Sequence, residues 1–92
     1  MEISLKGHRA LITGGSRGLG RAMAEAFAAA GADVAVVARE ESVLQETTAA
    51  LNDIRPSGRF IGISADVSDA AHLERAHRQA VEFLGPIDVL VN

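Results

Sequence analysis

Short apolar runs alternate along the chain with longer segments whose apolar residues recur every three or four positions. The apolar runs are residues 9–13, 33–38, 59–64 and 87–92. Runs of this length without polar alternation are typical of strands buried on both faces, whereas the longer segments carry the spacing of amphipathic helices. The pattern therefore predicts the element order βαβαβαβ.

The expected helices also carry terminal signals. The first begins at Leu19 and ends before Gly31, which suits a helix C-terminus. Ser42 with Gln45 resembles a capping box for the second, and Ser68 is the predicted N-cap of the third. Predicted inward-facing residues are Ala22, Met23, Ala26, Phe27 and Ala30 in the first helix, Val43, Leu44, Leu51 and Ile54 in the second, and Leu73, Ala76, Ala80, Val81 and Leu84 in the third.

Alternating strands and helices predict a parallel α/β sheet, because each helix returns the chain for the next parallel strand. We expect a three-layer, Rossmann-like doubly wound sheet with strand order 3-2-1-4. The last run is too apolar for an exposed edge strand. Residues 1–92 are therefore expected to be the N-terminal portion of a single Rossmann-fold domain, with further strands after Asn92. The alternative is that a partner chain covers this edge.

Composition narrows the function classes. The 92 residues carry a net charge of −3 without a basic block, which disfavours nucleic acid and anionic membranes as partners. The chain has no cysteine, no signal-peptide pattern and no apolar run of the ~20 residues that a membrane span needs. His72 and His77 lack the one-turn spacing of a helical metal pair, so no metal site is expected. These features predict a soluble, cytoplasmic protein.

The segment TGGSRGLG places four glycines between the first strand and the first helix. A strand-to-helix turn directs free backbone N–H groups and the positive end of the helix dipole to one point, where a pyrophosphate can bind. Gly14 suits the tight turn, Gly18 a close approach of the ligand, and Gly20 close packing of helix on strand. The alternative is an ordinary glycine-rich loop.

The glycine spacing T-G-x-x-x-G-x-G, Asp66-Val67 after the third strand and the VLVN ending together resemble the short-chain dehydrogenase/reductase family. The resemblance covers the whole chain. Sugar-nucleotide epimerases, by contrast, have the spacing T-G-x-x-G-x-x-G. The resemblance implies that Ser16 helps to bind phosphate, that Asp66 and Val67 contact adenine, and that the Asn92 backbone flanks the adenosine ribose. The full set of expected cofactor-binding residues is Gly14, Ser16, Arg17, Gly18, Leu19, Gly20, Arg39, Asp66, Val67 and Asn92.

The end of the second strand indicates which nucleotide is bound. NAD-preferring folds carry an acidic residue there, but this chain has Ala38 followed by Arg39. Arg39 and Arg17 offer forked donors suited to a phosphate dianion, which favours NADP(H) over NAD. Both arginines could instead be solvated surface charges, with Glu40 or Glu41 neutralising Arg39. Asp66 could serve only the start of the third helix.

The resemblance implies an NADP(H)-dependent oxidoreductase that transfers hydride between nicotinamide and a carbonyl or secondary alcohol, as a homodimer or homotetramer. This stretch would supply cofactor binding only. The family's proton donor is a tyrosine, and the chain has none. We assign no catalytic residue, and expect His8, His72 and His77 to be surface residues. The alternative is a non-catalytic dinucleotide-binding module. The substrate and the direction of the reaction stay open.

Overall fold

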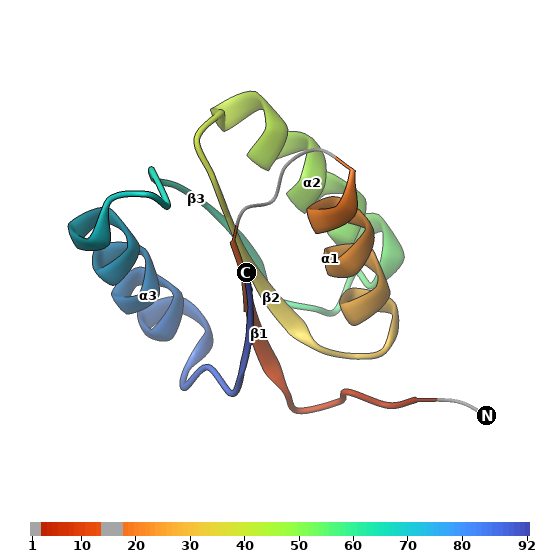
Figure 1. Ribbon diagram of the computed structural model, residues 1–92. Coiled ribbons are helices and arrows are strands. Elements are labelled where there is room, and N and C mark those ends of the chain that lie inside the picture. The colour runs from red at the N-terminus through yellow and green to blue at the C-terminus, as the bar shows by residue number, and fades with distance from the viewer. Residues whose placement is uncertain (1–2, 14–17) are drawn as a thin grey trace.

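The computed structural model describes residues 3–13 and 18–92, and within them the chain forms the predicted alternation of strands and helices (Figure 1). The strands are β1 (Arg9–Ile12), β2 (Asp33–Ala38), β3 (Phe60–Ser64) and β4 (Val89–Val91). The helices are α1 (Leu19–Ala29), α2 (Glu41–Ile54) and α3 (Ala70–Leu84).

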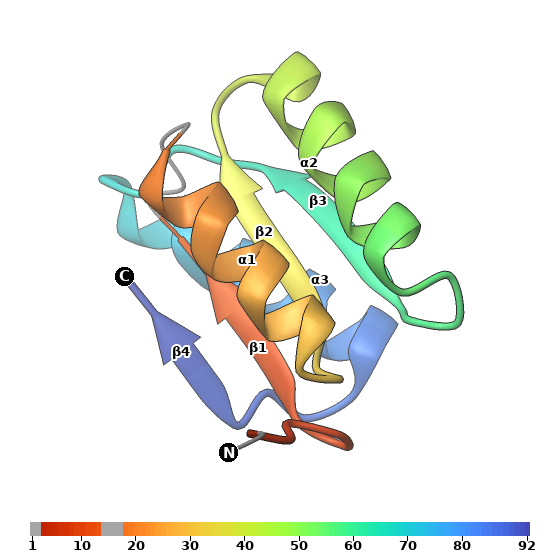
Figure 2. The same cartoon turned by 90° about the vertical axis from the view of Figure 1, so that its right-hand side faces the viewer.

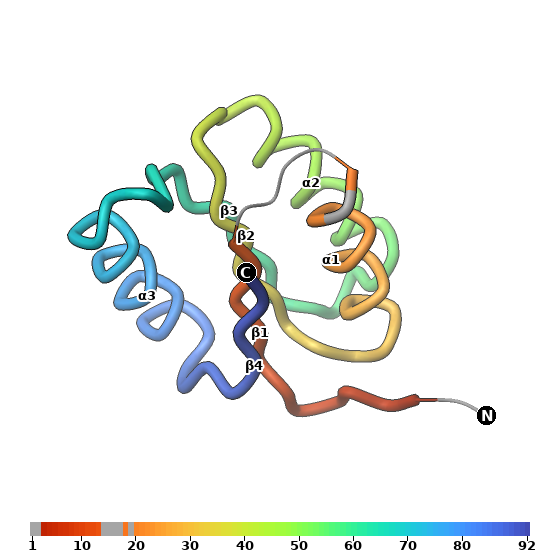
Figure 3. The backbone as a smooth tube through the Cα atoms, in the orientation of Figure 1, coloured from red at the N-terminus to blue at the C-terminus, as the bar shows by residue number. Residues whose placement is uncertain are grey.

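The four strands form one parallel sheet in the order β3-β2-β1-β4. Leu11 of β1 pairs with Ala35 of β2 on one side and with Leu90 of β4 on the other. The tube in Figure 3 shows the last residues of the chain running beside β1, although about 80 positions separate them in sequence. The predicted α/β, Rossmann-like fold and its strand order are confirmed.

Helices cover both faces of the sheet. In Figures 1 and 2, α1 and α2 lie on one face and α3 on the other. Successive residues of a buried strand face opposite sides of the sheet. In β2, Val34 and Val36 pack toward α1 and α2, whereas Ala35 and Val37 pack toward α3. A strand in the middle of this sheet is therefore expected to be apolar at nearly every position, and in β2 only the first residue, Asp33, is polar.

The face of α1 that meets the sheet differs from the predicted one. Ala24 and Ala28 are fully buried, while Ala22 and Ala26 are exposed; the bulky Met23 and Phe27 pack against the core but stay partly buried. The two alanine rows both satisfy helical spacing. The smaller residues face the strands because a backbone approaches most closely where side chains are short.

Two predicted helix caps are wrong. Glu40 is the N-cap of α2 and makes no side-chain cap hydrogen bond, so Ser42 and Gln45 form no capping box around the start of this helix. Asp69, not Ser68, caps α3, and its carboxylate accepts from the backbone N–H groups of residues 71 and 72. The prediction that Gly31 ends the first helix is confirmed. Gly31 follows α1 and has a φ of 105°, a value that favours glycine.

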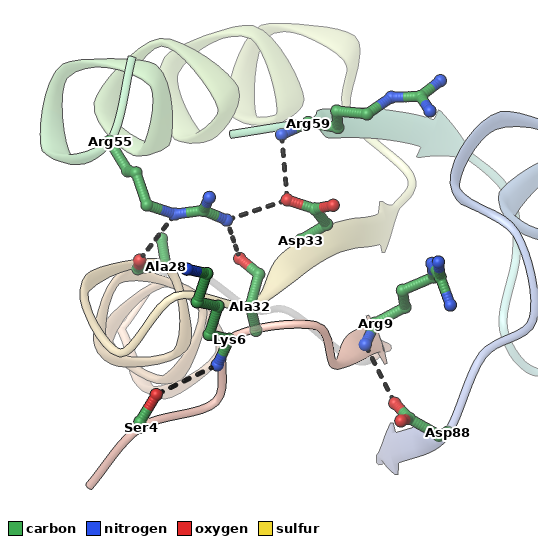
Figure 4. Close-up of polar contacts among 9 residues, drawn as sticks. All are labelled: Ser4, Lys6, Arg9, Ala28, Ala32, Asp33, Arg55, Arg59 and Asp88. Atoms are coloured by element: carbon green, nitrogen blue, oxygen red, sulfur yellow. Dashed lines mark hydrogen bonds and ion pairs between the residues drawn. The ribbon is translucent and has the colours of Figure 1, made fainter. Parts of the chain in front are cut away.

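At the amino edge of the sheet, a network of polar contacts joins the connection between α1 and β2 to the connection between α2 and β3 (Figure 4). Arg55 follows α2 and donates to the carbonyl oxygens of Ala28 and Ala32 and to the carboxylate of Asp33. The same Asp33 oxygen accepts from the backbone N–H of Arg59. These contacts stabilise the amino edge of the sheet. The predicted site lies at the opposite edge, where the strands have their carboxyl ends.

Candidate cofactor site

All four strands end at the same edge of the sheet, because they are parallel (Figure 2). Five of the predicted residues stand at this carboxyl edge or at the helix start beside it. They are Gly18 before α1, Arg39 after β2, Asp66 and Val67 between β3 and α3, and Asn92 after β4. The crevice beyond the carboxyl ends of the strands is where open α/β sheets bind ligands.

The glycine-rich turn is described only in part. Gly14, Ser16 and Arg17 lie outside the described residues. Leu19 is the first residue of α1 by its backbone, and Gly20 is buried in the first helical turn. The burial of Gly20 agrees with its predicted place against the sheet.

Gly18 stands at the open start of α1. It is the N-cap residue, no side chain caps the helix there, and its carbonyl oxygen accepts the first helical bond from Ala22. Gly18 is exposed, and a Cβ built on it would meet no heavy atom of the described chain within 4 Å. Its φ of −90° is accessible to any residue, so neither backbone strain nor packing against residues 3–13 and 20–92 accounts for glycine here.

Arg39 and Asp66 form an ion pair that bridges the ends of β2 and β3. The Arg39 Nη2 atom lies 3.0 Å from Asp66 Oδ2, with 72% of the arginine side chain and 34% of the aspartate side chain exposed. The Ser64 hydroxyl donates to the Arg39 carbonyl oxygen at 3.0 Å, which fixes the backbone beneath the guanidinium. Two residues predicted separately for cofactor binding are thus in direct contact.

Ser68 completes this arrangement. Its hydroxyl donates to Asp66 Oδ1 at 2.6 Å, and its backbone N–H donates to the same oxygen at 3.0 Å. These two hydrogen bonds, with a smaller contribution from Arg39, lower the pKa of Asp66 to about 2. Asp66 is therefore a carboxylate at neutral pH and carries a full negative charge next to Arg39.

The loop that carries Asp66 is also tied to α3. The Asp66 backbone N–H donates to His72 Nδ1 at 3.3 Å. Beside it, Val67 leaves 38% of its surface exposed, which is unusual for a valine. The loop thus presents an ionised carboxylate and an apolar side chain at the carboxyl edge of the sheet.

Thr13 and Asn92 join the ends of the two neighbouring strands β1 and β4. The buried Thr13 hydroxyl lies 2.9 Å from Asn92 Oδ1 and 3.3 Å from the carbonyl oxygen of Val91. The Thr13 backbone N–H also donates to that carbonyl, at 2.8 Å. Thr13 was missing from the predicted site set, although its place at the head of the glycine segment was the available signal.

A groove of about 310 Å³ opens between the first turns of α1 and α2, next to Arg39 in the chain. This volume is at the lower end of the range for small-molecule sites. Its lining residues are Arg21, Glu40, Ser42, Val43, Glu46 and Thr47. Among the described lining residues Arg21 is positive while Glu40 and Glu46 are negative, so these residues give the groove no excess positive charge.

Metal ligands, membrane-spanning helices or catalytic histidines would each indicate another function for the described part of the chain. No group of three or more metal-ligating side chains occurs among residues 3–13 and 18–92. None of the helices described there combines the length and apolar character that a membrane crossing requires. His8 pairs with Asp88 at the amino edge, and His77 is exposed on α3, so neither lies at the carboxyl edge.

The parallel sheet with order 3-2-1-4, covered on both faces, together with a glycine-rich sequence between β1 and α1, defines a Rossmann-like protein. The family model described as short chain dehydrogenase matches residues 8–92. The chain therefore belongs to the short-chain dehydrogenase/reductase family, whose members are NAD(P)-dependent oxidoreductases. The resemblance inferred from the glycine spacing, Asp66-Val67 and Asn92 is confirmed.

Curated relatives match nearly the whole chain. A short chain dehydrogenase of Pseudocercospora fijiensis is 40% identical over 96% of this chain, and the uncharacterized oxidoreductase YhdF of Bacillus subtilis is 43% identical over the same share. The chain spans only 28% and 30% of the lengths of these two proteins.

Solved structures agree with this assignment. L-sorbose reductase from Gluconobacter frateurii, complexed with NADPH and L-sorbose, superimposes with a TM-score of 0.91 at 33% identity, over 100% of this chain and 35% of that one. A short-chain dehydrogenase/reductase from Serratia marcescens has a TM-score of 0.88 at 39% identity, over 96% of this chain and 36% of its own.

Proposed function

We propose that residues 1–92 form the cofactor-binding portion of an NADP(H)-dependent oxidoreductase acting on a small carbonyl or secondary alcohol. The bound cofactor would supply the hydride. The chain itself would hold the cofactor, and the residues that handle the substrate would lie outside it. By family resemblance we also expect the whole protein to form a homodimer or homotetramer.

The observation that carries this proposal is the open start of α1. At Gly18 the helix begins without a side-chain cap, and a Cβ there would enter space that the described chain leaves empty. A helix N-terminus places N–H groups and positive potential at this point, which suits a pyrophosphate. Glycine is explained if a ligand, rather than the protein, approaches this backbone.

The choice of NADP(H) over NAD(H) rests on Arg39. The guanidinium is largely exposed at the end of β2, where an NAD-preferring fold has an acidic residue. Its pairing is with Asp66, and this contact uses one of the five N–H donors of a guanidinium. The remaining donors suit the oxygens of a 2′-phosphate, while the exposed Val67 offers an apolar contact for the adenine ring.

A non-catalytic dinucleotide-binding module is the second candidate, because the described residues hold no assigned proton donor. The two candidates differ in turnover. An oxidoreductase consumes NADPH in the presence of a carbonyl substrate, which absorbance at 340 nm would follow across a panel of ketones and sugars. A non-catalytic module would bind NADPH but would not oxidise it in the presence of any ketone or sugar of the panel.

The proposal is tested by the substitution Gly18→Val. Two methyl groups at the mouth of α1 would occupy the place of the pyrophosphate, so NADPH affinity in calorimetric titration should fall at least about 100-fold. The fold should be retained, since the new side chain meets no atom of the described residues nearby. Unchanged affinity with an intact circular dichroism spectrum would overturn the proposal.

The cofactor preference is tested by Arg39→Ala, which removes the guanidinium without placing a second carboxylate beside Asp66. Loss of one charged donor to phosphate should weaken NADPH binding by about 10- to 100-fold and leave NADH binding nearly unchanged. Arg78→Ala is the matched control, because Arg78 is an exposed arginine on α3 that makes a long contact of 3.8 Å to Glu74. Equal losses for both cofactors would contradict the NADP(H) assignment.

A further inference from the structure

We propose that Ser68 is a positioning residue for cofactor discrimination: acting through Asp66, it holds the Arg39 guanidinium where a 2′-phosphate binds. This inference rests on the proposed NADP(H) function. It adds a residue that need not touch the cofactor, and that the sequence pattern indicated only as a helix cap.

The contacts run in one chain from α3 to the end of β2. Ser68 donates twice to Asp66 Oδ1, from its hydroxyl at 2.6 Å and its backbone N–H at 3.0 Å. The other carboxylate oxygen, Oδ2, lies 3.0 Å from Arg39 Nη2. The two oxygens of one carboxylate thus have different partners, so fixing Oδ1 also fixes the direction of Oδ2.

The serine is free for this task because it does not cap the helix. Asp69 accepts from the backbone N–H groups of residues 71 and 72, which are the groups that an N-cap side chain serves. The short hydrogen bond from Ser68 is therefore directed entirely within the loop. Its effect is on the carboxylate of Asp66 and not on the start of α3.

The Arg39–Asp66 pair contributes little to folding by itself, since an ion pair with an arginine 72% exposed is screened by water. Its effect on a ligand is larger. An arginine side chain has many rotamers, and part of this conformational entropy is lost whenever the guanidinium binds a phosphate. A guanidinium already oriented by Asp66 loses less on binding, which favours the cofactor that bears the phosphate.

Asp66 could also oppose a phosphate, because both are negatively charged. The two effects predict opposite results when the Ser68 hydroxyl is removed. If Asp66 mainly orients Arg39, a freer carboxylate weakens NADPH binding. If it mainly competes for Arg39, loosening it strengthens NADPH binding. The double anchoring of Oδ1 favours orientation, because it fixes the carboxylate whose other oxygen contacts the guanidinium at Nη2.

The test compares the affinities of NADPH and NADH, measured by calorimetry, in Ser68→Ala, Ser68→Thr and the control Ser57→Ala. Ser57 is an exposed serine between α2 and β3, at the opposite edge of the sheet. Ser68→Ala should weaken NADPH binding by about three- to tenfold, as expected for losing one of two hydrogen bonds to a charged group, with NADH unchanged. Ser68→Thr keeps the hydroxyl and should retain the wild-type preference for NADPH over NADH. Ser57→Ala should bind both cofactors as the wild type does.

A double variant separates this inference from the proposed function. In an Arg39→Ala background, Ser68→Ala should have no further effect on the ratio of NADPH affinity to NADH affinity, because the guanidinium that Ser68 positions is gone. If Arg39→Ala lowers this ratio but Ser68→Ala leaves it unchanged or raises it, only the inference about Ser68 is overturned. If Arg39→Ala itself leaves the ratio unchanged, the NADP(H) assignment fails and this inference fails with it. A purely structural role would instead lower both affinities together.

Discussion

The Arg55 guanidinium lies 2.8 Å from the Asp33 carboxylate, and this pair joins the end of α2 to the start of β2 (Figure 4). Both side chains are three-quarters buried. Arg55 also donates to the backbone carbonyls of Ala28 and Ala32, so one side chain links the α1–β2 and α2–β3 connections. These contacts stabilise the amino edge of the sheet, away from the carboxyl edge.

Arg55→Ala should therefore lower the free energy of unfolding by about 2 kcal/mol, because it leaves a partly buried carboxylate and two carbonyls without their charged donor. Urea unfolding would measure the change. Arg55→Lys should recover only part of it, since an ammonium cannot reproduce the planar fork. The exposed Arg78→Ala is the control and should change stability by less than about 0.5 kcal/mol. If Arg55→Ala changed stability no more than Arg78→Ala does, the proposed stabilising role of the Arg55 contacts would be contradicted.

Gly62→Ala should destabilise the fold, although alanine in a strand interior is normally more stable than glycine. A Cβ at Gly62 would lie 2.9 Å from the Cβ of Leu44, which is buried in α2. Overpacking of this kind lowers stability by about 1–3 kcal/mol, which thermal unfolding would detect. Gly18→Ala is the matched glycine control and should leave the melting temperature within experimental error. A stable Gly62→Ala variant would show that α2 can shift away from β3.

Thr13→Val removes a buried hydroxyl while keeping the shape of the side chain. Because the hydroxyl contacts Asn92 and the carbonyl of Val91, the change should lower stability by about 1 kcal/mol. The β4 amides should then exchange faster in hydrogen–deuterium exchange, while those of β2 stay protected. Thr13→Ser keeps the hydroxyl and should leave the exchange of β4 near that of wild type. Equal exchange in the two variants would exclude a role for this hydroxyl.

The Asp66 carboxyl should titrate near pH 2, where carbon-13 NMR can follow it. Its pKa in the folded protein lies below the unfolded value of about 3.9, so its contribution to stability is present above pH 3.9 and lost as pH falls toward 2. Removing the largest cause with Ser68→Ala should raise this pKa. Titration near 4 in the wild-type protein would mean that Ser68 and Arg39 do not contact the carboxylate in solution.

Much of the architecture was predictable because it depends on local pattern. The run Asp33–Ala38 is apolar at nearly every position, and β2 has those bounds. The parallel order 3-2-1-4 follows from the alternation of strands and helices together with the handedness of crossover connections. β1, β3 and β4 are each shorter than the predicted runs, because terminal residues of those runs, such as Thr13, Arg59 and Asn92, lie just outside the strands.

Side-chain details were less predictable where several residues satisfy one rule. In α1, alanines occur both at 22 and 26 and at 24 and 28, so spacing alone cannot choose the buried row. At α3, Ser68 and Asp69 are both good N-cap residues, and the aspartate takes the position. Each choice depends on how closely the helix or loop packs against the sheet.

The sequence by itself therefore determined the element order, the family and the place of Arg39, Asp66 and Asn92 after their strands, because these depend on periodicity and on motif spacing. Only the tertiary structure decided which of those residues touch. Arg39 and Asp66 are 27 positions apart, and Thr13 and Asn92 are 79 apart. Their contacts exist because neighbouring parallel strands bring the ends of distant segments to one edge, where the register sets which side chains meet.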